Sequence, residues 1–299
     1  MTRMKTEQST KGARRARMSV RLASHYGMCF GVRDALRKTH EAAAGGKVTV
    51  LGQLVHNPLV DAELERLGVE SAELAQQAGS VDGEVVITAH GVSDRELERW
   101  QGAGHTVHDT TCPLVRKAHS ALASLVAAGY LPVVIGRPGH VEVEGLIGDF
   151  PGAVVIESFR DMLKLPSMGR IGVVAQTTQP IERVREMVAQ LRRCRPECEV
   201  KFVDTVCAPT KDRQYALQEL CADCEVVVVV GGSNSNNTKE LACTAERLGA
   251  RAIRVERASD LQRRWFRGVK SVGVTAGTST LDETVRQVFE RLQRFSSGI

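Results

Sequence analysis

Three cysteines occupy equivalent places in three similar stretches of this chain. Cys29, Cys112 and Cys207 are each followed by an apolar run that ends at a glycine, 23, 24 and 24 residues further on. One thiol per repeat predicts that three thiols are brought to one point. Three thiolates can hold an iron–sulfur cluster and leave one iron open, and an open coordination position is what a catalytic metal site requires.

Four of the remaining five cysteines offer a competing metal site. Cys194 and Cys198 form a C-x3-C pair and Cys221 and Cys224 a C-x2-C pair, 22 residues apart, which is a tolerable spacing for structural zinc. The first pair has no counterpart in the other repeats, and the second ends a helix that leads into a buried strand. We therefore expect ordinary thiols there, with zinc as the alternative. Cys243, on a helical face, is expected in the core.

The composition is typical of a cytoplasmic globular protein. The chain has 299 residues, of which 42% are hydrophobic and 25% charged, so two or three domains are expected. No apolar stretch approaches the roughly 20 residues that span a bilayer, and no secretory segment follows the basic N-terminus. In the reducing cytoplasm, eight cysteines are expected to be thiols or metal ligands rather than disulfides.

The net charge of +5 comes from the first 17 residues. These carry six basic residues against one acidic residue, and they predict a disordered leader. A nucleic-acid-binding arm or a transit peptide is the alternative, but dispersed charges without aromatic residues favour neither. Neither nucleic acid nor a membrane is an expected partner.

The whole chain after the leader reads as three copies of one α/β unit, at 18–104, 105–198 and 199–299, the last with a C-terminal helix. Each copy begins with a strand, the cysteine turn and a helix, and continues into a β-rich run that ends at the repeated glycine. The second half of each copy adds a helix, a short strand, a further helical stretch around Leu74, Leu163 or Leu261, and a last strand.

Such alternation predicts parallel sheets with right-handed crossovers, and ligand sites in these sheets lie beyond the carboxyl ends of the strands. The fold class is therefore α/β, with three small parallel-sheet domains around a pseudo-threefold axis. The same edge carries His56, His90, His140, the loop 233–237 and Ser279. Histidines, hydroxyls and amides near helix N-termini suit a phosphate or diphosphate, and because Lys and Arg are scarce here, hydrogen bonds would capture it.

In these residues the sequence resembles the IspH (LytB) family, the 4-hydroxy-3-methylbut-2-enyl diphosphate reductases of the non-mevalonate isoprenoid pathway. The resemblance runs from about residue 20 to 293. It rests on Cys29-Phe30-Gly31-Val32, Val55-His56-Asn57, Ala89-His90-Gly91-Val92-Ser93, Thr111-Cys112-Pro113-Leu114-Val115, Gly139-His140-Val141-Glu142-Val143-Glu144-Gly145, Gln176-Thr177-Thr178, Arg213-Gln214, Ser235-Asn236-Asn237 and Gly273-Val274-Thr275-Ala276-Gly277.

The resemblance implies a trefoil of three domains around a 4Fe–4S cluster, and reductive loss of an allylic hydroxyl to give isopentenyl and dimethylallyl diphosphates. It implies that Cys29, Cys112 and Cys207 are the metal ligands, that Glu142 is the proton donor, and that Thr177 contacts the substrate hydroxyl. The implied diphosphate-binding residues are His56, His90, His140, Ser235, Asn236, Asn237 and Ser279.

The resemblance also points to a ferredoxin or flavodoxin as electron donor, and no Gly-rich dinucleotide fingerprint suggests otherwise. A monomer or homodimer is expected. Two departures adjoin the implied proton donor: Val141 stands where the family usually has Pro, and Arg137-Pro138 is unusual. The alternatives are a divergent paralogue that reduces or hydrates a related alkenyl or alkynyl diphosphate, and a non-catalytic iron–sulfur or zinc protein that senses redox state.

Overall fold

Every strand pair in the described residues is parallel, and the strands form three separate four-stranded sheets. The computed structural model describes residues 17–166 and 169–297, so most of the predicted leader lies outside the described residues. In spatial order, the sheets contain β3 (Glu70–Ala72), β2 (Val48–Leu51), β4 (Glu84–Ile87) and β5 (Val107–Asp109); β7 (Val154–Ile156), β6 (Leu131–Ile135), β8 (Arg170–Ala175) and β9 (Glu199–Phe202); and β1 (Ser19–Leu22), β12 (Ser271–Ala276), β10 (Val226–Val230) and β11 (Arg251–Val255).

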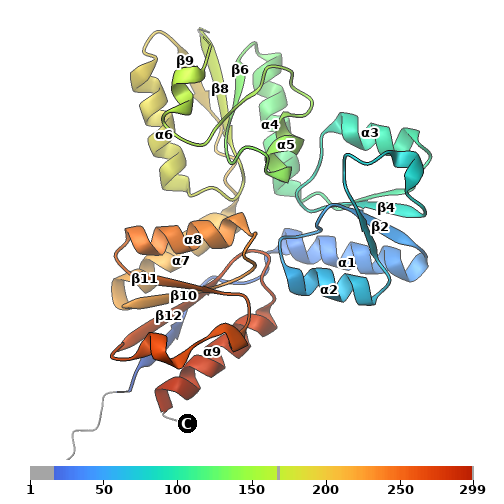
Figure 1. The fold of residues 1–299 in the computed structure, drawn as a ribbon. Coiled ribbons are helices and arrows are strands. Elements are labelled where there is room, and N and C mark those ends of the chain that lie inside the picture. The colour runs from blue at the N-terminus through green and yellow to red at the C-terminus, as the bar shows by residue number, and fades with distance from the viewer. Residues whose placement is uncertain (1–16, 167–168, 298–299) are drawn as a thin grey trace, which may run out of the picture.

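Helices cover both faces of each sheet, and the three lobes meet at the middle of the molecule (Figure 1). The α-helices are α1 (Phe30–Gly45), α2 (Pro58–Arg66), α3 (Asp94–Gly102), α4 (Pro113–Ala127), α5 (Val141–Ile147), α6 (Ile181–Cys194), α7 (Ala208–Asp223), α8 (Asn236–Arg247) and α9 (Asp282–Ser297). The predicted α/β class with three parallel-sheet domains is confirmed. None of the described helices is both long and apolar enough to cross a membrane.

The central strands are β-branched because both of their faces are covered. All five residues of β10 are valines with at most 2% exposure, and the inner residues of β6 and β8 are equally buried. The stretches around Leu74, Leu163 and Leu261 are shorter than the predicted helices. They form turns and single 3-10 turns, at Ala78–Ser80, Asp161–Lys164 and Ala258–Asp260.

The sheets are offset from the sequence repeats by one strand. The strand that begins each repeat pairs with the last strand of another repeat: β5 with β4, β9 with β8, and β1 with β12. The last pairing closes the ring, because Ser19 N donates to Lys270 O at 2.8 Å across 251 residues of sequence. A short segment leads from each exchanged strand to its cysteine, and the cysteine N–H bonds to the adjoining lobe, so each cysteine turn lies between two lobes.

The repeated glycine at the end of β2, β6 and β10 has a local reason in each copy. Gly52 and Gly231 have φ values of +94° and +153°, where side chains are disfavoured. Gly136 does not have a positive φ, but a Cβ there would lie 2.8 Å from Val143 Cγ2 and 3.0 Å from Gln176 Cβ. The glycines therefore let the loops after the central strands turn tightly toward the middle of the molecule.

Candidate active site

Each of the three repeated cysteines caps the N-terminus of a helix. Cys29 precedes α1, Cys112 precedes α4 and Cys207 precedes α7. The loop that follows β4, β8 or β12 is the second polar loop of its lobe. The backbone N–H of each cysteine donates to a carbonyl in the second polar loop of the adjoining lobe: Cys29 to Thr278 O at 2.9 Å, Cys112 to Ala89 O at 3.1 Å and Cys207 to Thr177 O at 3.0 Å. The same hydrogen bond thus recurs three times around the pseudo-threefold axis.

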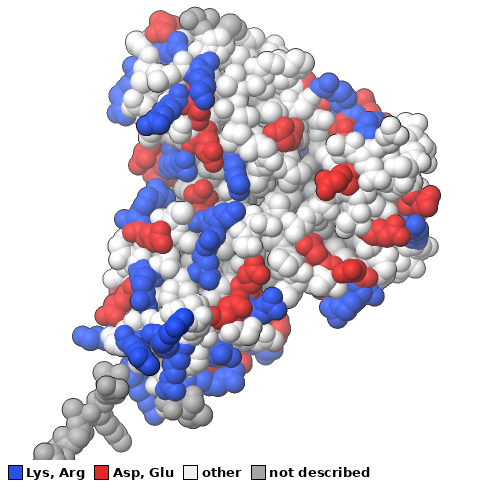
Figure 2. Space-filling model, viewed as in Figure 1, with Lys and Arg blue, Asp and Glu red and all other residues white. Residues whose placement is uncertain are grey.

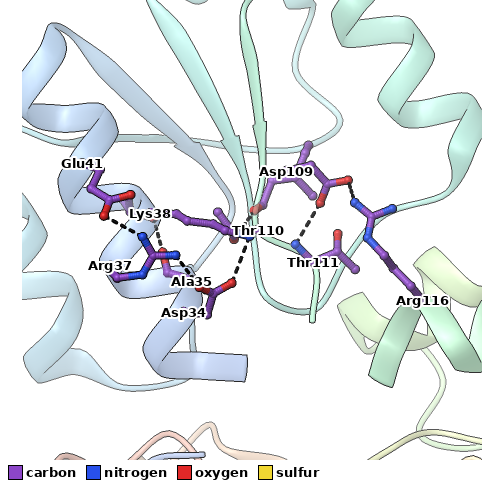
Figure 3. A network of polar contacts seen from close by, with 11 residues as sticks. Asp34, Ala35, Arg37, Lys38, Glu41, Asp109, Thr110, Thr111 and Arg116 are labelled. Atoms are coloured by element: carbon purple, nitrogen blue, oxygen red, sulfur yellow. Dashed lines mark hydrogen bonds and ion pairs between the residues drawn. The ribbon is translucent and has the colours of Figure 1, made fainter. Parts of the chain in front are cut away.

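An aspartate shapes two of the three cysteine turns. Asp109 Oδ1 accepts from Thr111 N at 2.8 Å and its other oxygen accepts from Arg116, one helical turn after Cys112 (Figure 3). Asp204 repeats the pattern, accepting from Val206 N at 3.1 Å and from Lys211 Nζ at 2.8 Å. The Asp-Thr-x-Cys motif therefore fixes the turn that delivers the cysteine to the helix N-terminus.

The three thiols gather around one centre. Gly31 stands two residues after Cys29, and a Cβ added to it would lie only 2.5 Å from Cys112 Sγ. The Cys112 thiol therefore lies against the turn that carries Cys29. The thiols of Cys112 and Cys207 both interact electrostatically with Cys29 and with the Glu142 carboxyl. All three cysteines are free and partly buried. Within residues 17–166 and 169–297, no three cysteine sulfurs lie within 4.8 Å of one another, so these thiols are spaced more widely than the ligands of a single ion.

Burial raises the pKa of the Cys112 thiol and raises that of Cys207 to about 11. Hydrogen bonds from the first turns of the helices oppose this shift, as does the Thr210 hydroxyl, 3.1 Å from Cys207 Sγ. A metal that displaces the thiol protons would receive three soft, anionic ligands at three helix N-termini. The residues present therefore fit an iron–sulfur cluster with three protein ligands.

The competing cysteine set does not assemble. Cys194 ends α6, over the second sheet, whereas Cys221 and Cys224 lie at the end of α7, over the third. Cys221 and Cys224 interact with each other, and Glu197 and Arg195 are among the groups that act on Cys198. Within residues 17–166 and 169–297, no three of these four sulfurs lie within 4.8 Å of one another, so the structure does not bring together the ligands that the zinc alternative needs. The prediction that Cys243 lies in the core was wrong: it is exposed, because α8 buries the opposite face through Leu241, Ala242 and Ala245.

Three histidines from three loops form one compact group. The ring centroids of His56 and His90 are 4.5 Å apart, and the His140 ring lies 5.3 Å and 5.6 Å from them, edge-on. The Nε2 atoms of His56 and His90 are buried without a hydrogen-bond partner. His140 Nδ1 accepts from Glu142 N at 3.1 Å, so its Nε2 carries the proton of the neutral ring. The group therefore holds unused hydrogen-bonding capacity.

Polar loops of the third lobe lie beside this group. Ser235 caps α8, and Asn236 and Asn237 form its buried first turn. Asn237 Oδ1 accepts from Thr278 N at 3.1 Å, while its Nδ2 is buried without a partner. Ser279 Oγ donates to His56 O at 3.2 Å and joins the two lobes. Together with the histidines, these side chains and the α8 N-terminus form a hydrogen-bonding site that suits an anion. Lys239 and Arg137 add positive charge near it, since both act electrostatically on His56.

The Glu142 carboxyl lies between the thiols and the second polar loop of its lobe. It is 2% exposed, and its Oε1 accepts from Thr177 N at 2.6 Å. Burial raises the pKa of Glu142 to about 7, although hydrogen bonds from the Thr177 backbone and hydroxyl lower it. A carboxyl with this pKa can hold a proton at neutral pH and release it to a neighbouring acceptor. With Val141 in place of the usual Pro, α5 still directs Glu142 onto Thr177.

Comparison with known proteins shows the family to which the chain belongs. The family model described as LytB protein matches residues 20–293. The chain belongs to the LytB family. A 4-hydroxy-3-methylbut-2-enyl diphosphate reductase from Geotalea uraniireducens is 40% identical over 282 residues, 93% of this chain and 98% of the relative.

Two solved structures share the LytB fold with this chain. One is the E-1-hydroxy-2-methyl-but-2-enyl-4-diphosphate reductase from Plasmodium falciparum, with a TM-score of 0.86, 27% identity and coverage of 92% of this chain and 87% of the other. The second is an (E)-4-hydroxy-3-methyl-but-2-enyl diphosphate reductase, described as the terminal enzyme of the non-mevalonate pathway. It gives a TM-score of 0.66, 35% identity and coverage of 93% and 100%.

Within this LytB chain, the predicted site residues lie at the carboxyl ends of the strands or at adjoining helix N-termini. The structure adds Thr210 and Arg213, which sequence reasoning did not assign. Thr210 is fully buried beside the Cys207 sulfur, and Arg213 is 6% exposed and hydrogen-bonded to the turn before Cys29. Two signals were available: a Thr stands three residues after one of the repeated cysteines, and Arg213 belongs to one of the segments that match the family.

Acidification is expected to destabilise this LytB protein through its histidine group. Burial lowers the pKa of His56, lowers that of His140 to about 4 and places that of His90 well below the ordinary 6.5. As pH falls below about 6.5, the unfolded chain binds protons that the folded chain does not, so stability is lost between about 6.5 and 4. Urea unfolding midpoints are measured at pH 7 and at pH 5. The decrease in midpoint between the two pH values should be smaller in His90→Asn than in the wild type. Equal falls would remove His90 from this effect.

Proposed function

We propose that this protein reductively removes the allylic hydroxyl of 4-hydroxy-3-methylbut-2-enyl diphosphate and yields isopentenyl and dimethylallyl diphosphates. The observation that carries the proposal is the gathering of three helix-capping thiols, a buried carboxyl with a pKa of about 7 and three neutral histidines around one centre. The relatives that match nearly the whole chain are reductases of this type by name.

Cys29, Cys112 and Cys207 would hold the 4Fe–4S cluster. When bound, it would supply electrons one at a time and an open iron that acts as a Lewis acid. The net reaction takes two electrons and two protons: the allylic C–O bond breaks, a C–H bond forms, and the hydroxyl leaves as water. The chain must therefore bind the diphosphate, deliver a proton to the hydroxyl and keep bulk water out.

The diphosphate would occupy the site made by the histidines and the third-lobe loops. The Nε2 atoms of His56 and His90 and the Nδ2 of Asn237 have no partner in the described residues, so an anion would satisfy buried polar atoms. Ser235, Asn236, Ser279 and His140 complete the proposed set. Because the histidines stay neutral, recognition would depend on hydrogen bonds, on the α8 N-terminus and on the nearby charges of Lys239 and Arg137.

Glu142 would supply the proton, and Thr177 would pass it on. The carboxyl is hydrogen-bonded to Thr177, whose hydroxyl can donate to the substrate oxygen while it accepts from Glu142. Hydroxide is a poor leaving group, so a proton held at this point lowers the barrier to C–O cleavage. Burial of Glu142 and Thr177, at 2% and 4% exposure, keeps solvent from competing for the proton.

Anaerobic reconstitution followed by turnover tests this function. Protein reconstituted with iron and sulfide should consume the hydroxymethylbutenyl diphosphate with reduced methyl viologen and release both isoprene diphosphates. A related alkenyl or alkynyl diphosphate, offered alone, should turn over much more slowly. A loaded protein that prefers the related substrate would make the chain a divergent paralogue. A loaded protein inert toward every diphosphate would leave it a non-catalytic redox protein.

A ferredoxin or flavodoxin is the proposed electron donor, and the reducing cytoplasm the proposed compartment. A basic residue stands four residues after each cysteine, at Arg33, Arg116 and Lys211, and all three are at least partly exposed. Figure 2 shows both signs of charge intermixed over the face in view, so an acidic donor would be guided locally. These three cations lie in the first turns of the helices that the cysteines cap, and each is paired with an aspartate.

Charge reversal at Arg116 is expected to weaken donor docking without touching the chemistry. Arg116→Glu places two negative charges beside Cys112, because Asp109 loses its partner, so the KM for an acidic ferredoxin should rise severalfold and its salt dependence should weaken. The kcat with methyl viologen, a small cation, should stay near the wild-type value. The exposed Arg185→Glu on α6 is the matched control. An unchanged KM for ferredoxin would place docking elsewhere.

A further inference from the structure

The turn before Cys29 is held differently from the other two. Asp109 and Asp204 stand three residues before Cys112 and Cys207, whereas Tyr26 occupies that place before Cys29. This turn therefore lacks the aspartate that accepts from a backbone N–H in the other two turns, and Gly27 has a φ of +71°. Its carbonyls accept hydrogen bonds from two arginines of different lobes.

Arg213 is the buried one of the two. It comes from α7, in the third lobe, and its guanidinium donates to Gly27 O, to Tyr26 O at 3.3 Å and to Pro209 O at 2.6 Å. Pro209 lies two residues after Cys207. One side chain therefore ties the turn that delivers Cys29 to the helix that begins at Cys207, across 186 residues of sequence.

The charge of Arg213 has no carboxylate partner among the described residues. All its hydrogen-bond acceptors are backbone carbonyls, and the side chain is 6% exposed. Burial lowers the pKa of Arg213, and the strongest opposing influences are the thiols of Cys29 and Cys207, ahead of Asp212. A buried cation is costly unless an anion compensates it, and a guanidinium does not give up its proton in a protein.

We propose that Arg213 is a positioning residue and the internal counter-ion of the bound cluster: it fixes Cys29 relative to Cys207 and its positive charge raises the cluster's reduction potential. The proposal rests on the cluster assigned under the proposed function. Thiolates replace thiols when the metal binds, so the cation becomes compensated only in the loaded protein. A fixed cation favours the more negative, reduced cluster and so makes reduction easier.

Arg33 provides a matched control on the same turn. It donates to Met28 O from Nε at 3.2 Å and from Nη2 at 2.9 Å, so it too holds a carbonyl next to Cys29. Its side chain, however, is 58% exposed and pairs with Asp282 at 3.1 Å. Replacing Arg33 removes a hydrogen bond to the turn without removing a buried, uncompensated charge.

The test compares Arg213→Gln, Arg213→Lys and Arg33→Gln in the full chain, reconstituted anaerobically. Iron and sulfide per chain, the midpoint potential from a redox titration followed by electron paramagnetic resonance, and the rate of iron loss to a chelator are measured. Arg213→Gln should shift the potential downward and lose iron roughly tenfold faster or more. Arg213→Lys should recover most of the potential but not the slow iron loss. Arg33→Gln should leave the potential unchanged.

Thermal unfolding of the metal-free proteins keeps the test decisive if Arg213→Gln assembles no cluster. Removing an uncompensated cation should leave metal-free Arg213→Gln as stable as the metal-free wild type or more so, while Arg213→Lys still reports the potential. The proposal is overturned by a potential equal to wild type in loaded Arg213→Gln, or by a fall in metal-free melting temperature as large as that of the loaded protein. Wild-type turnover, measured alongside, reports separately on the proposed reaction.

Discussion

Cys207→Ser is expected to yield a colourless protein with less than about one iron per chain after anaerobic reconstitution, against about four for the wild type. Cys207 is one of three thiols that cap α1, α4 and α7 around one centre, and burial already raises its pKa to about 11. A serine hydroxyl is a poorer iron ligand and would stay protonated at that depth. Turnover should vanish with the cluster, and this is the largest effect expected of any single substitution here.

Cys243→Ser is the control for the loss of a thiol as such. Cys243 is an exposed cysteine on α8, outside the group of three, and its replacement should leave the iron content unchanged. The same measurement on Cys29→Ser and Cys112→Ser should repeat the Cys207→Ser result. A wild-type protein that stays colourless and binds one zinc per chain would contradict the assignment of the three cysteines as cluster ligands.

The repeated pattern predicted the fold because parallel α/β units leave a strong local signal. Continuous valine runs, the glycines at 52, 136 and 231 and the cysteine turns all sit where the structure has strand ends. The pairing of each repeat's first strand with the last strand of another repeat has no such local signal in the sequence. β1 has the same local pattern whether it pairs with β2 or with β12, and only the packing of the whole ring selects β12, far away in sequence.

The site could be predicted where residues follow a strand, and not where lobes meet. The cysteines and histidines sit at carboxyl ends of strands, a place defined by chain order alone. Arg213 lies in mid-helix, and its role depends on contact with Gly27 from another lobe. His140 caps α5 through its Nδ1, which accepts from Glu142 N. The sequence did not predict this contact, because it depends on where α5 begins. The sequence therefore could not supply contacts between lobes, such as that of Arg213, or the side-chain geometry of a local turn, such as that of His140.

The electrostatics of the site divide into two neighbouring regions. Around the three histidines, burial favours the neutral form of groups that could be cationic, so the anion site depends on hydrogen bonds. Around the thiols, burial favours the protonated form of groups that could be anionic. Glu142 belongs to the second region and touches the second polar loop, so its proton lies between the proposed cluster and the proposed substrate.

Glu142→Gln is accordingly expected to keep the cluster and lose about 10²- to 10⁴-fold of kcat, the usual contribution of a general acid. The amide oxygen can still accept from Thr177 N, so the loop should stay in place, but the amide has no acidic proton to give. In the wild type, the carboxyl loses its proton as pH rises through its pKa of about 7, so kcat with reduced methyl viologen should fall above that pH. This alkaline fall should be absent from Glu142→Gln.

Glu144→Gln is the control on the same helix. Glu144 is exposed, and its Oε1 accepts from Gly139 N at 3.1 Å without reaching Thr177. Its replacement should leave both kcat and the pH profile near those of the wild type. Because iron content is measured in every variant, lost activity can be separated from a lost cluster. Full activity in loaded Glu142→Gln would remove Glu142 from the proton path and shift that role to the substrate's own diphosphate, the remaining acid beside the hydroxyl.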